Sequence, residues 1–144
     1  MLRNEMDAED VLQHSFMDAY KNIGSFNYKS TPGAWLKRIV INNCINHLKK
    51  KKMKIVDIDD SYDLAADPED EKVEYSVKGV KDAIMELPEG YRIVLTMYLL
   101  EGYDHSEIAD FLGISDSTSK SQYSRARKKL KEILIERNIN IYER

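Results

Sequence analysis

Residues 102–130 read GYDHSEIADFLGISDSTSKSQYSRARKKL and decide how the second half of the chain folds. Asp104 is a common N-cap residue, and Glu107 stands three positions later, as in a capping box. Gly113 follows an apolar run at the point where a helix ends in a left-handed residue, and Ser115 is a second N-cap. The stretch therefore predicts two short helices joined by a tight turn, which is a helix-turn-helix.

The second of these predicted helices has two different faces when it is divided at about 100° per residue. The inward face carries a stripe at spacings of three and four: Ser119, Tyr123, Ala126, Leu130, Ile133 and Leu134. The outward face carries hydroxyls first and cations later: Ser117, Ser121, Ser124, Arg125 and Lys128, flanked by Lys120, Arg127 and Lys131. This order suits a helix that enters a DNA major groove by its start and contacts phosphates further along. A solvated helix surface is the alternative, although such surfaces usually mix charges of both signs.

Charge is distributed unevenly along the 144 residues, whose formal net charge is −3. Positive charge gathers in 37–54 and again in 117–131, whereas 55–74 is strongly acidic. Apolar residues recur at helical spacing, and no strand-like alternation is found. We therefore expect an all-α fold of two small helical domains joined by a flexible acidic linker. The expected boundaries are 1–54, 55–74 for the linker, 75–137, and 138–144 for a loose tail. We further expect the linker acids to fold back on the basic segments when DNA is absent.

The composition argues against several functional classes. Cys44 is the only cysteine, and no apolar run reaches about 18 residues, so a cytoplasmic chain without a disulfide or a membrane helix is expected. His14, His47 and His105 are far apart and lack metal-ligand spacing. We expect these to be solvated or helix-surface histidines, and we expect neither a cofactor, a metal nor an enzyme.

The first half of the chain predicts a helix over 7–23. Its apolar stripe comprises Val11, Leu12, Ser15, Phe16, Ala19, Tyr20 and Ile23. A polar group projects outward: Asp7, Glu9, Asp10 and Gln13. On the residues alone, this group serves either capping and solubility or a partner.

A loop over 24–31 and a helix over 32–52 follow. Phe26 and Tyr28 beside Lys29 offer a stacking surface and a phosphate contact for single-stranded nucleic acid, or an apolar lock between two helices. On the helix, a second face aligns Trp35, Ile39, Asn42 and Asn46, with Asn43 at its border. Such amides either read adenine edges or bond to a neighbouring helix. In the second half, 77–87 and 88–101 predict two further helices, the latter the most buried.

Taken together, these motifs resemble RNA polymerase sigma factors of the sigma-70 family, extracytoplasmic-function group. In the first half, DAEDVLQ (residues 7–13), Phe16, Ala19 and Tyr20, and AWLKRI, NN and NHLKKK within 34–51 are similar to region two. In the second half, ELPEGYRIVL (residues 86–95) and EIADFLGIS followed by RARKKL within 107–130 are similar to region four. The resemblance implies a non-enzymatic protein that binds the polymerase core, directs it to promoters and helps open the duplex.

The resemblance also implies a role for particular residues. Asp7, Glu9, Asp10 and Gln13 correspond to the surface for the beta-prime clamp helices, and the beta flap is a second expected polymerase contact. The minus-ten element is expected to meet Phe26, Tyr28, Lys29, Trp35, Asn42 and Asn46. The minus-thirty-five element is expected to meet Ser117, Lys120, Ser121, Gln122, Ser124, Arg125 and Lys128. An anti-sigma protein is a further expected partner.

Three features differ from the family pattern. Ser119 replaces a branched apolar residue, so a buried hydroxyl is expected to loosen the helix by about 1 kcal/mol or more if it lacks a partner. Gln122 and Ser124 replace an arginine and a bulkier residue, which predicts a different or weaker promoter preference. Only six residues precede Asp7, where the family has a further helix, so region two is expected to be shortened and its core partly exposed. Two other functions stay open: a helix-turn-helix regulator independent of polymerase, and a shortened module that binds an anti-sigma protein or polymerase without supporting initiation.

Overall fold

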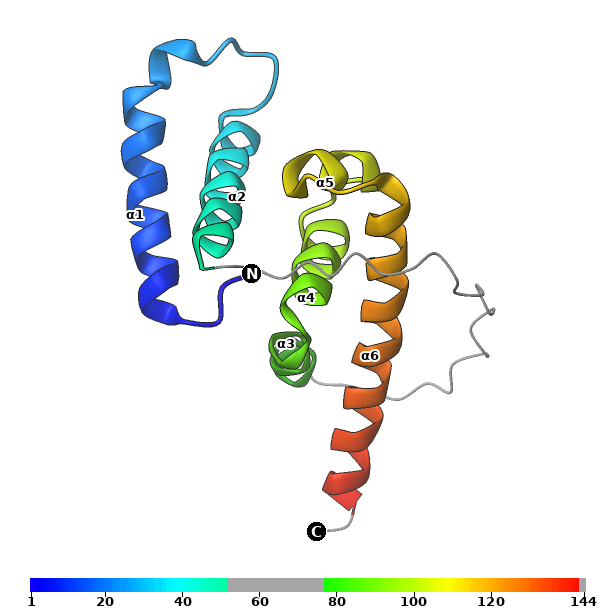
Figure 1. Cartoon of the computed structure of the whole chain (residues 1–144). Helices are drawn as coiled ribbons and strands as arrows, with labels where there is room; N and C mark the ends of the chain where they lie inside the picture. Colours follow the sequence, from blue (N-terminus) through cyan, green and yellow to red (C-terminus); the bar gives the residue numbers. More distant parts are fainter. Residues whose placement is uncertain (52–76, 143–144) are drawn as a thin grey trace. The chain divides into compact units, whose positions relative to one another are not determined.

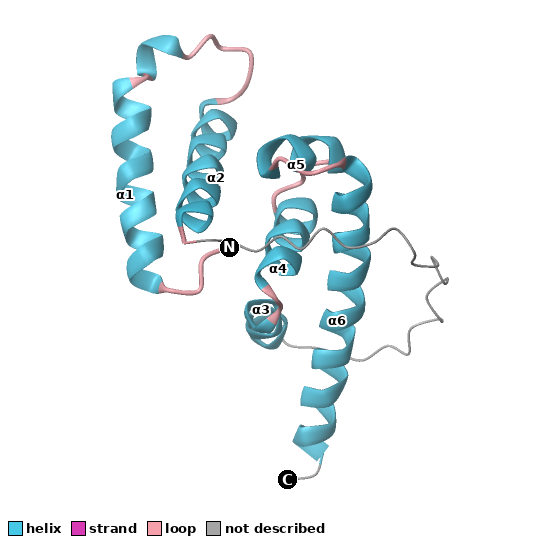
Figure 2. Ribbon diagram, in the orientation of Figure 1, coloured by secondary structure: helices cyan, strands magenta, loops and turns pink. Residues whose placement is uncertain are grey.

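The computed structural model describes residues 1–51 and 77–142, with side chains described up to residue 137. The chain divides into two compact units, 1–53 and 54–144, each of which is described by itself. All regular elements of the described ranges are helical, which confirms the predicted all-α class (Figures 1 and 2). The predicted acidic linker over 55–74 lies outside the described residues.

The first unit is a hairpin of two helices that run in opposite directions (Figure 1). Helix α1 spans Glu5–Lys21, a short 3₁₀ turn, η1, spans Ile23–Ser25, and α2 spans Pro32–Lys50. The Asn4 and Thr31 side chains cap the two helices by accepting backbone N–H bonds. The core between the helices consists of Val11, Ser15 and Ala19 from α1 and Ile41, Cys44, Ile45 and Leu48 from α2.

Only part of the predicted apolar stripe on α1 is buried. Val11, Ser15 and Ala19 face α2, whereas the other large members are exposed: Leu12, Phe16, Tyr20 and Ile23. The stripe is wider than the strip that a single neighbouring helix covers, because side chains on either side of the contact line point past it. The first unit therefore carries an apolar surface on α1 beside its core.

The second unit is arranged around one long helix. Its elements are α3 (Val77–Glu86), α4 (Glu89–Leu95), the π-helical turn η2 (Thr96–Leu100), α5 (His105–Leu112) and α6 (Asp116–Tyr142). Helix α6 contacts α3, α4 and α5. The core cluster that joins them contains Ala83, Ile84, Leu87, Leu95, Ala126 and Ile133. At the far end of this cluster, the Arg137 guanidinium pairs with Glu86 and donates to the Gly79 carbonyl at 3.2 Å, which holds α6 against α3.

The helix predicted over 88–101 changes from α-helical to π-helical geometry at Thr96. The helical spacing of this stretch predicts an inward position for Val94, Leu95, Tyr98 and Leu99. Val94 and Leu95 are buried, but Tyr98 and Leu99 are 37% and 53% exposed. The π-helical turn rotates the chain away from the α-helical register, so residues that the 3.6-residue period places inside turn outward. Buried Arg92 donates to the Leu87 carbonyl at 3.0 Å and so joins α4 to the end of α3.

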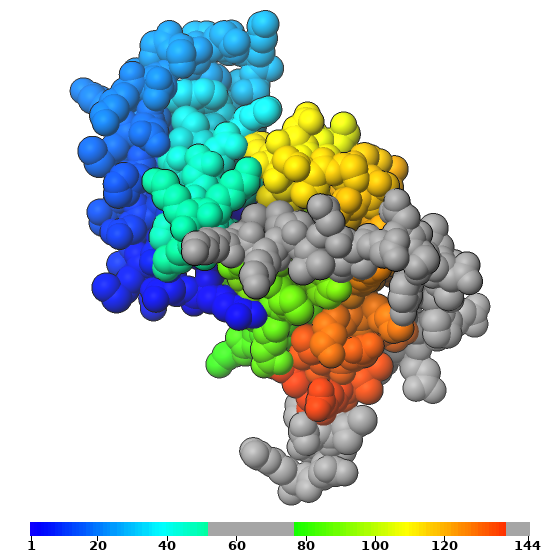
Figure 3. Space-filling view, in the orientation of Figure 1, coloured from blue at the N-terminus to red at the C-terminus, as the bar shows by residue number. Residues whose placement is uncertain are grey.

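The predicted helix-turn-helix is present with the predicted caps. Asp104 and Glu107 form a complete capping box at the start of α5, and Gly113 ends that helix with φ +69°. Helix α6 then continues to Tyr142, whereas the sequence predicts a loose tail from Asn138. Figure 3 shows α5 and the first turns of α6 next to each other at one end of the second unit.

Candidate nucleic-acid interface

Helix α6 separates its inward and outward faces as its sequence predicts. Ser119, Ala126 and Ile133 are buried, with Tyr123, Leu130 and Leu134 packed beside them. On the outward side, four predicted DNA-contacting residues are exposed: Ser117, Lys120, Ser124 and Lys128. Ser121 and Arg125, predicted on the same face, are half-buried. One face of α6 therefore combines hydroxyls and cations over about three turns.

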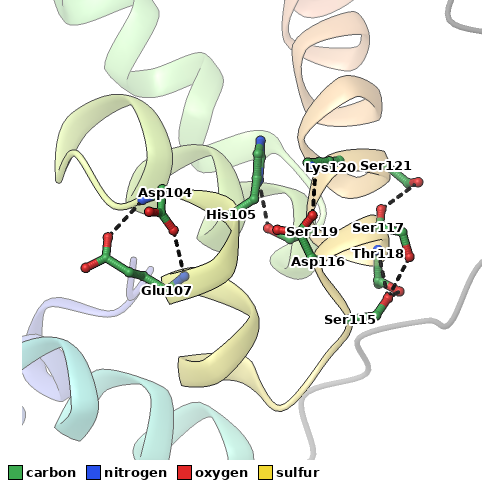
Figure 4. A network of polar contacts seen from close by, with 10 residues as sticks. All are labelled: Asp104, His105, Glu107, Ser115, Asp116, Ser117, Thr118, Ser119, Lys120 and Ser121. Atoms are coloured by element: carbon green, nitrogen blue, oxygen red, sulfur yellow. Dashed lines mark hydrogen bonds and ion pairs between the residues drawn. The ribbon is translucent and has the colours of Figure 1, made fainter.

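The first turn of α6 is ordered by its own polar side chains (Figure 4). The Ser115 hydroxyl accepts from the Thr118 backbone N–H at 3.0 Å and lies 2.9 Å from the Ser117 hydroxyl. The Ser121 hydroxyl donates to the Ser117 carbonyl at 2.9 Å. Lys120 Nζ lies 2.6 Å from an Asp116 carboxylate oxygen. The hydroxyl and ammonium groups are thus held in place before any ligand binds.

Gln122 is placed differently from the other residues predicted to contact the minus-thirty-five element. Its side chain is 3% exposed and lies against α4, where a Cβ added to Gly90 would stand 3.6 Å from its Oε1. Three helical steps put Gln122 only about 60° from Ser119, on the inward face. The resemblance suggests a DNA contact at this position, whereas the geometry of the second unit gives Gln122 a packing role between α4 and α6.

His105 and Ser119 form a pair that sequence reasoning missed. His105 is predicted to be solvated or on a helix surface, but its ring is partly buried, with Nδ1 2.9 Å from the Ser119 hydroxyl. Ser119 is completely buried, so the hydroxyl expected to weaken the helix has a partner. Burial lowers the pKa of His105, with Asp116 opposing and Lys120 adding to that shift. The two residues are 14 positions apart and belong to different helices, so no local pattern indicates the pair.

In the first unit, the structure brings three aromatic residues together beside the loop between α1 and α2. The Phe26 ring centroid lies 4.8 Å from that of Tyr28 and 5.4 Å from that of Trp35. Tyr28 is 86% exposed and has a φ of +57°, in the left-handed region. Lys29, on the same loop, is exposed, and its backbone N–H donates to the Asn27 side chain at 3.2 Å. Phe26 thus supports Tyr28 from the direction of α2 and leaves the Tyr28 ring largely open.

The three amides of α2 fall into two groups. Asn43 Nδ2 donates to Ser15 Oγ at 3.1 Å and to Asp18 Oδ2 at 2.9 Å, so this amide bonds to the neighbouring helix. Asn42 and Asn46 are exposed on α2. Of the two roles that the sequence leaves open for these amides, Asn43 has the structural one, because it bonds to the neighbouring helix. Asn42 and Asn46 are accessible to a ligand.

The polar group at the start of α1 also contains residues with different surroundings. Asp7 lies 2.6 Å from Lys51 Nζ and 3.5 Å from His47 Nε2, so it joins the start of α1 to the end of α2. The hydrogen bond from Lys51 is the main cause that lowers the pKa of Asp7. Glu9, Asp10 and Gln13 are exposed. Asp7 therefore joins the two helices of the first unit through its side chain.

Within 1–51 and 77–142, no cluster of three or more His, Cys, Asp or Glu side chains is arranged to hold a metal ion. No helix in the same ranges is long and apolar enough to cross a membrane.

Comparison with known proteins identifies the two units with two successive family regions. Residues 1–53 match the model of sigma-70 region 2, and residues 79–130 match that of sigma-70 region 4. The ECF RNA polymerase sigma factor SigM of Bacillus subtilis is 33% identical over 145 residues, covering 97% of this chain and 86% of the relative. SigM of Mycobacterium tuberculosis is 33% identical over 133 residues, with 92% of this chain and 66% of the relative covered.

A solved structure supports the same assignment. The sigma factor RpoE of Bartonella quintana, in complex with the anti-sigma factor NepR, superposes with a TM-score of 0.61 at 26% identity, covering 92% of this chain and 84% of that one. With two family regions in succession, a relative that is 33% identical over 97% of the chain, and a shared fold, the chain belongs to the extracytoplasmic-function group of the sigma-70 family.

Proposed function

We propose that this chain binds the RNA polymerase core and directs it to promoters, reading duplex DNA with its second unit and an unpaired strand with its first. The observation that carries the proposal is the presence of two chemically different surfaces on one chain. One is the hydroxyl and cation face of α6, and the other is the aromatic and amide surface of the first unit. A sigma factor has no catalytic step of its own, so the proposed activity is regulatory.

Helix α6 is proposed to read the minus-thirty-five element from the major groove. Its first-turn hydroxyls and Lys120 are suited to base edges and nearby phosphates, and Arg125 and Lys128 to the backbone beyond. Gln122 is proposed to act through packing against α4, since its side chain is buried. Ser124 stands in place of a bulkier residue, so the promoter sequence preference is proposed to differ from that of relatives.

The first unit is proposed to capture the minus-ten element after the strands separate. The open face of Tyr28, supported by Phe26, offers a stacking surface, and Lys29 offers a charge for the adjacent phosphate. Asn42 and Asn46 are suited to pair with base edges that are exposed only in the single strand. Flipping a base costs a few kcal/mol, which these contacts offset.

Glu9, Asp10 and Gln13 are proposed to bind the clamp helices of the beta-prime subunit, with Asp7 supporting them through its ion pair with Lys51. The beta flap is the proposed contact of the second unit. An anti-sigma protein is a further proposed partner, because the similar sigma factor of Bartonella quintana was solved in complex with one.

Transcription in vitro with purified polymerase core and a promoter library tests this proposal. We expect the chain to select a set of promoters, Arg125→Ala to weaken duplex binding, and Asn46→Ala to impair opening with little effect on duplex binding. If the chain binds DNA and the polymerase core changes neither that binding nor its selectivity, the helix-turn-helix regulator independent of polymerase is favoured instead. Binding to core without transcripts would favour the shortened module. Equal and negligible effects of both substitutions would contradict the assignment of the two surfaces.

A further inference from the structure

The ring of His105 lies where three helical segments of the second unit meet. Its Nδ1 is 2.9 Å from Ser119 Oγ on α6, and Figure 4 shows the two side chains pointing toward each other. The ring stacks on Tyr98 of η2 at a centroid distance of 4.5 Å and an interplanar angle of 16°. Tyr123 of α6 meets it edge-on at 5.6 Å. A single side chain at the start of α5 therefore touches both η2 and α6.

Ser119 is the residue of α6 that lies within hydrogen-bond distance of His105. It lies in the first turn of α6, is completely buried, and faces directly away from the side that carries Ser117 and Ser124. A buried hydroxyl is costly unless it is hydrogen-bonded, so Ser119 favours the one rotation of α6 that brings it to His105. That rotation also determines where the outward hydroxyls and cations point.

We propose that His105 is a positioning residue for DNA recognition: its bond to Ser119 fixes the rotation of α6 against α5 and so aims the outward face of α6. This inference rests on the proposed role of α6 in reading duplex DNA. The aromatic contacts with Tyr98 and Tyr123 hold the imidazole in the plane that the bond needs. The pair replaces the apolar contact that a branched residue at position 119 would make.

The charge state of the imidazole matters for this arrangement. A neutral ring can accept the Ser119 proton at Nδ1, whereas an imidazolium carries a proton there and cannot. Asp104 of the α5 cap and Asp116 of α6 favour protonation, Lys120 opposes it, and burial outweighs the acids, so the pKa is lowered. Because the pKa of His105 in the folded protein lies below the ordinary histidine value, the ring is still neutral at that ordinary value. The bond to Ser119 is lost only as the pH falls further, through the lowered pKa.

Three substitutions in the full-length chain test the proposal. His105→Asn puts an amide group near the place of Nδ1 but does not titrate, and His105→Leu keeps the bulk without the hydrogen bond. His14→Asn is the matched control, because His14 is an exposed histidine on α1 whose Nδ1 lies 2.8 Å from the Asp10 carbonyl. The probe is a DNA duplex that the wild-type chain selects from a randomised pool, and its affinity is measured by fluorescence anisotropy from about pH 5.5 to about pH 8.

We expect His105→Leu to weaken duplex binding roughly tenfold near neutral pH, and His105→Asn to stay within about threefold of the wild type. The wild type and His14→Asn should keep their affinity down to the ordinary histidine pKa of about 6.5 and lose it at the acidic end of the range, while His105→Asn should lose much less. Unfolding curves at each pH separate positioning from stability, since a purely structural role would lower affinity only through the unfolded fraction.

The outcomes distinguish the inference from the function on which it rests. If the wild type selects no duplex, the proposed role of α6 fails, and the inference fails with it. If the wild type binds a duplex and His105→Leu binds equally well, only the inference is overturned. It is also overturned if His105→Asn follows the pH profile of the wild type, or if the loss in His105→Leu matches its unfolded fraction.

Discussion

Asn43→Ala and Asn46→Ala change the same residue type on the same helix, three positions apart, and should affect different properties: stability in the first case and promoter opening in the second. The Asn43 amide donates to Ser15 Oγ at 3.1 Å and to the Asp18 carboxylate at 2.9 Å across the hairpin. Losing these bonds should lower the free energy of unfolding of the first unit by about 1 to 3 kcal/mol. Asn46 is exposed, and its removal should change that free energy by no more than about 0.5 kcal/mol.

The assay for stability can be confined to the first unit, because Trp35 is the only tryptophan and lies on α2. Thermal unfolding followed by Trp35 fluorescence should show a midpoint lowered by about 4 to 8 °C per kcal/mol in Asn43→Ala, as for a small domain. The midpoint of Asn46→Ala should stay close to that of the wild type.

The functional assay uses polymerase core and promoter DNA with a base analogue that fluoresces when unpaired. Asn46→Ala should weaken opening by about 1 to 3 kcal/mol if its amide pairs with a base edge. Asn43→Ala should open promoters normally at temperatures where it is folded. The reasoning would be refuted if Asn46→Ala destabilised the hairpin as much as Asn43→Ala, or if opening depended on Asn43 and not on Asn46.

Three further changes test other parts of the molecule. Gly113→Ala should destabilise the second unit by about 1 to 2 kcal/mol, because φ is +69° while no atom lies within 4 Å of the added Cβ; Gly113→Asn should recover part of this, as circular dichroism melts would show. Arg125→Ala should reduce the slope of log affinity against log salt by about 0.9 in duplex binding. Asp7→Asn should make Trp35-detected stability less sensitive to acid, since the lowered pKa of Asp7 means that its ion pair with Lys51 stabilises at neutral pH and is lost below about pH 4.

The elements of the fold could be predicted because their information is local. Caps at Asp104 and Thr31, the proline that starts α2 and the left-handed Gly113 all act within a few residues of where they stand. The inward stripe of α6 follows from the 3.6-residue period alone. The period also indicates an inward position for Gln122, where the resemblance to the family implies a DNA contact.

What could not be predicted depends on contacts across the fold. The apolar stripe on α1 is wider than the part that α2 covers, and the sequence does not indicate which part that is. The stripe therefore predicts inward positions for Phe16 and Tyr20, which are exposed. The π-helical turn at Thr96 breaks the period that placed Tyr98 in the core. The bond between His105 and Ser119 joins residues of two helices, and the sequence around neither residue indicates that the other is its partner.

The same residue types recur in this chain with opposite uses, and burial rather than residue type separates them. Asn43 bonds within the hairpin while Asn46 is exposed, and Ser119 bonds within the second unit while Ser124 is exposed. In each pair, the inner member has its hydrogen-bonding capacity taken up by the fold, because a buried polar group without a partner is costly. The outer member is accessible to a ligand at little cost to stability. Changes in promoter preference should therefore be sought among the outer members, whereas changes at the inner members should alter the framework that aims them.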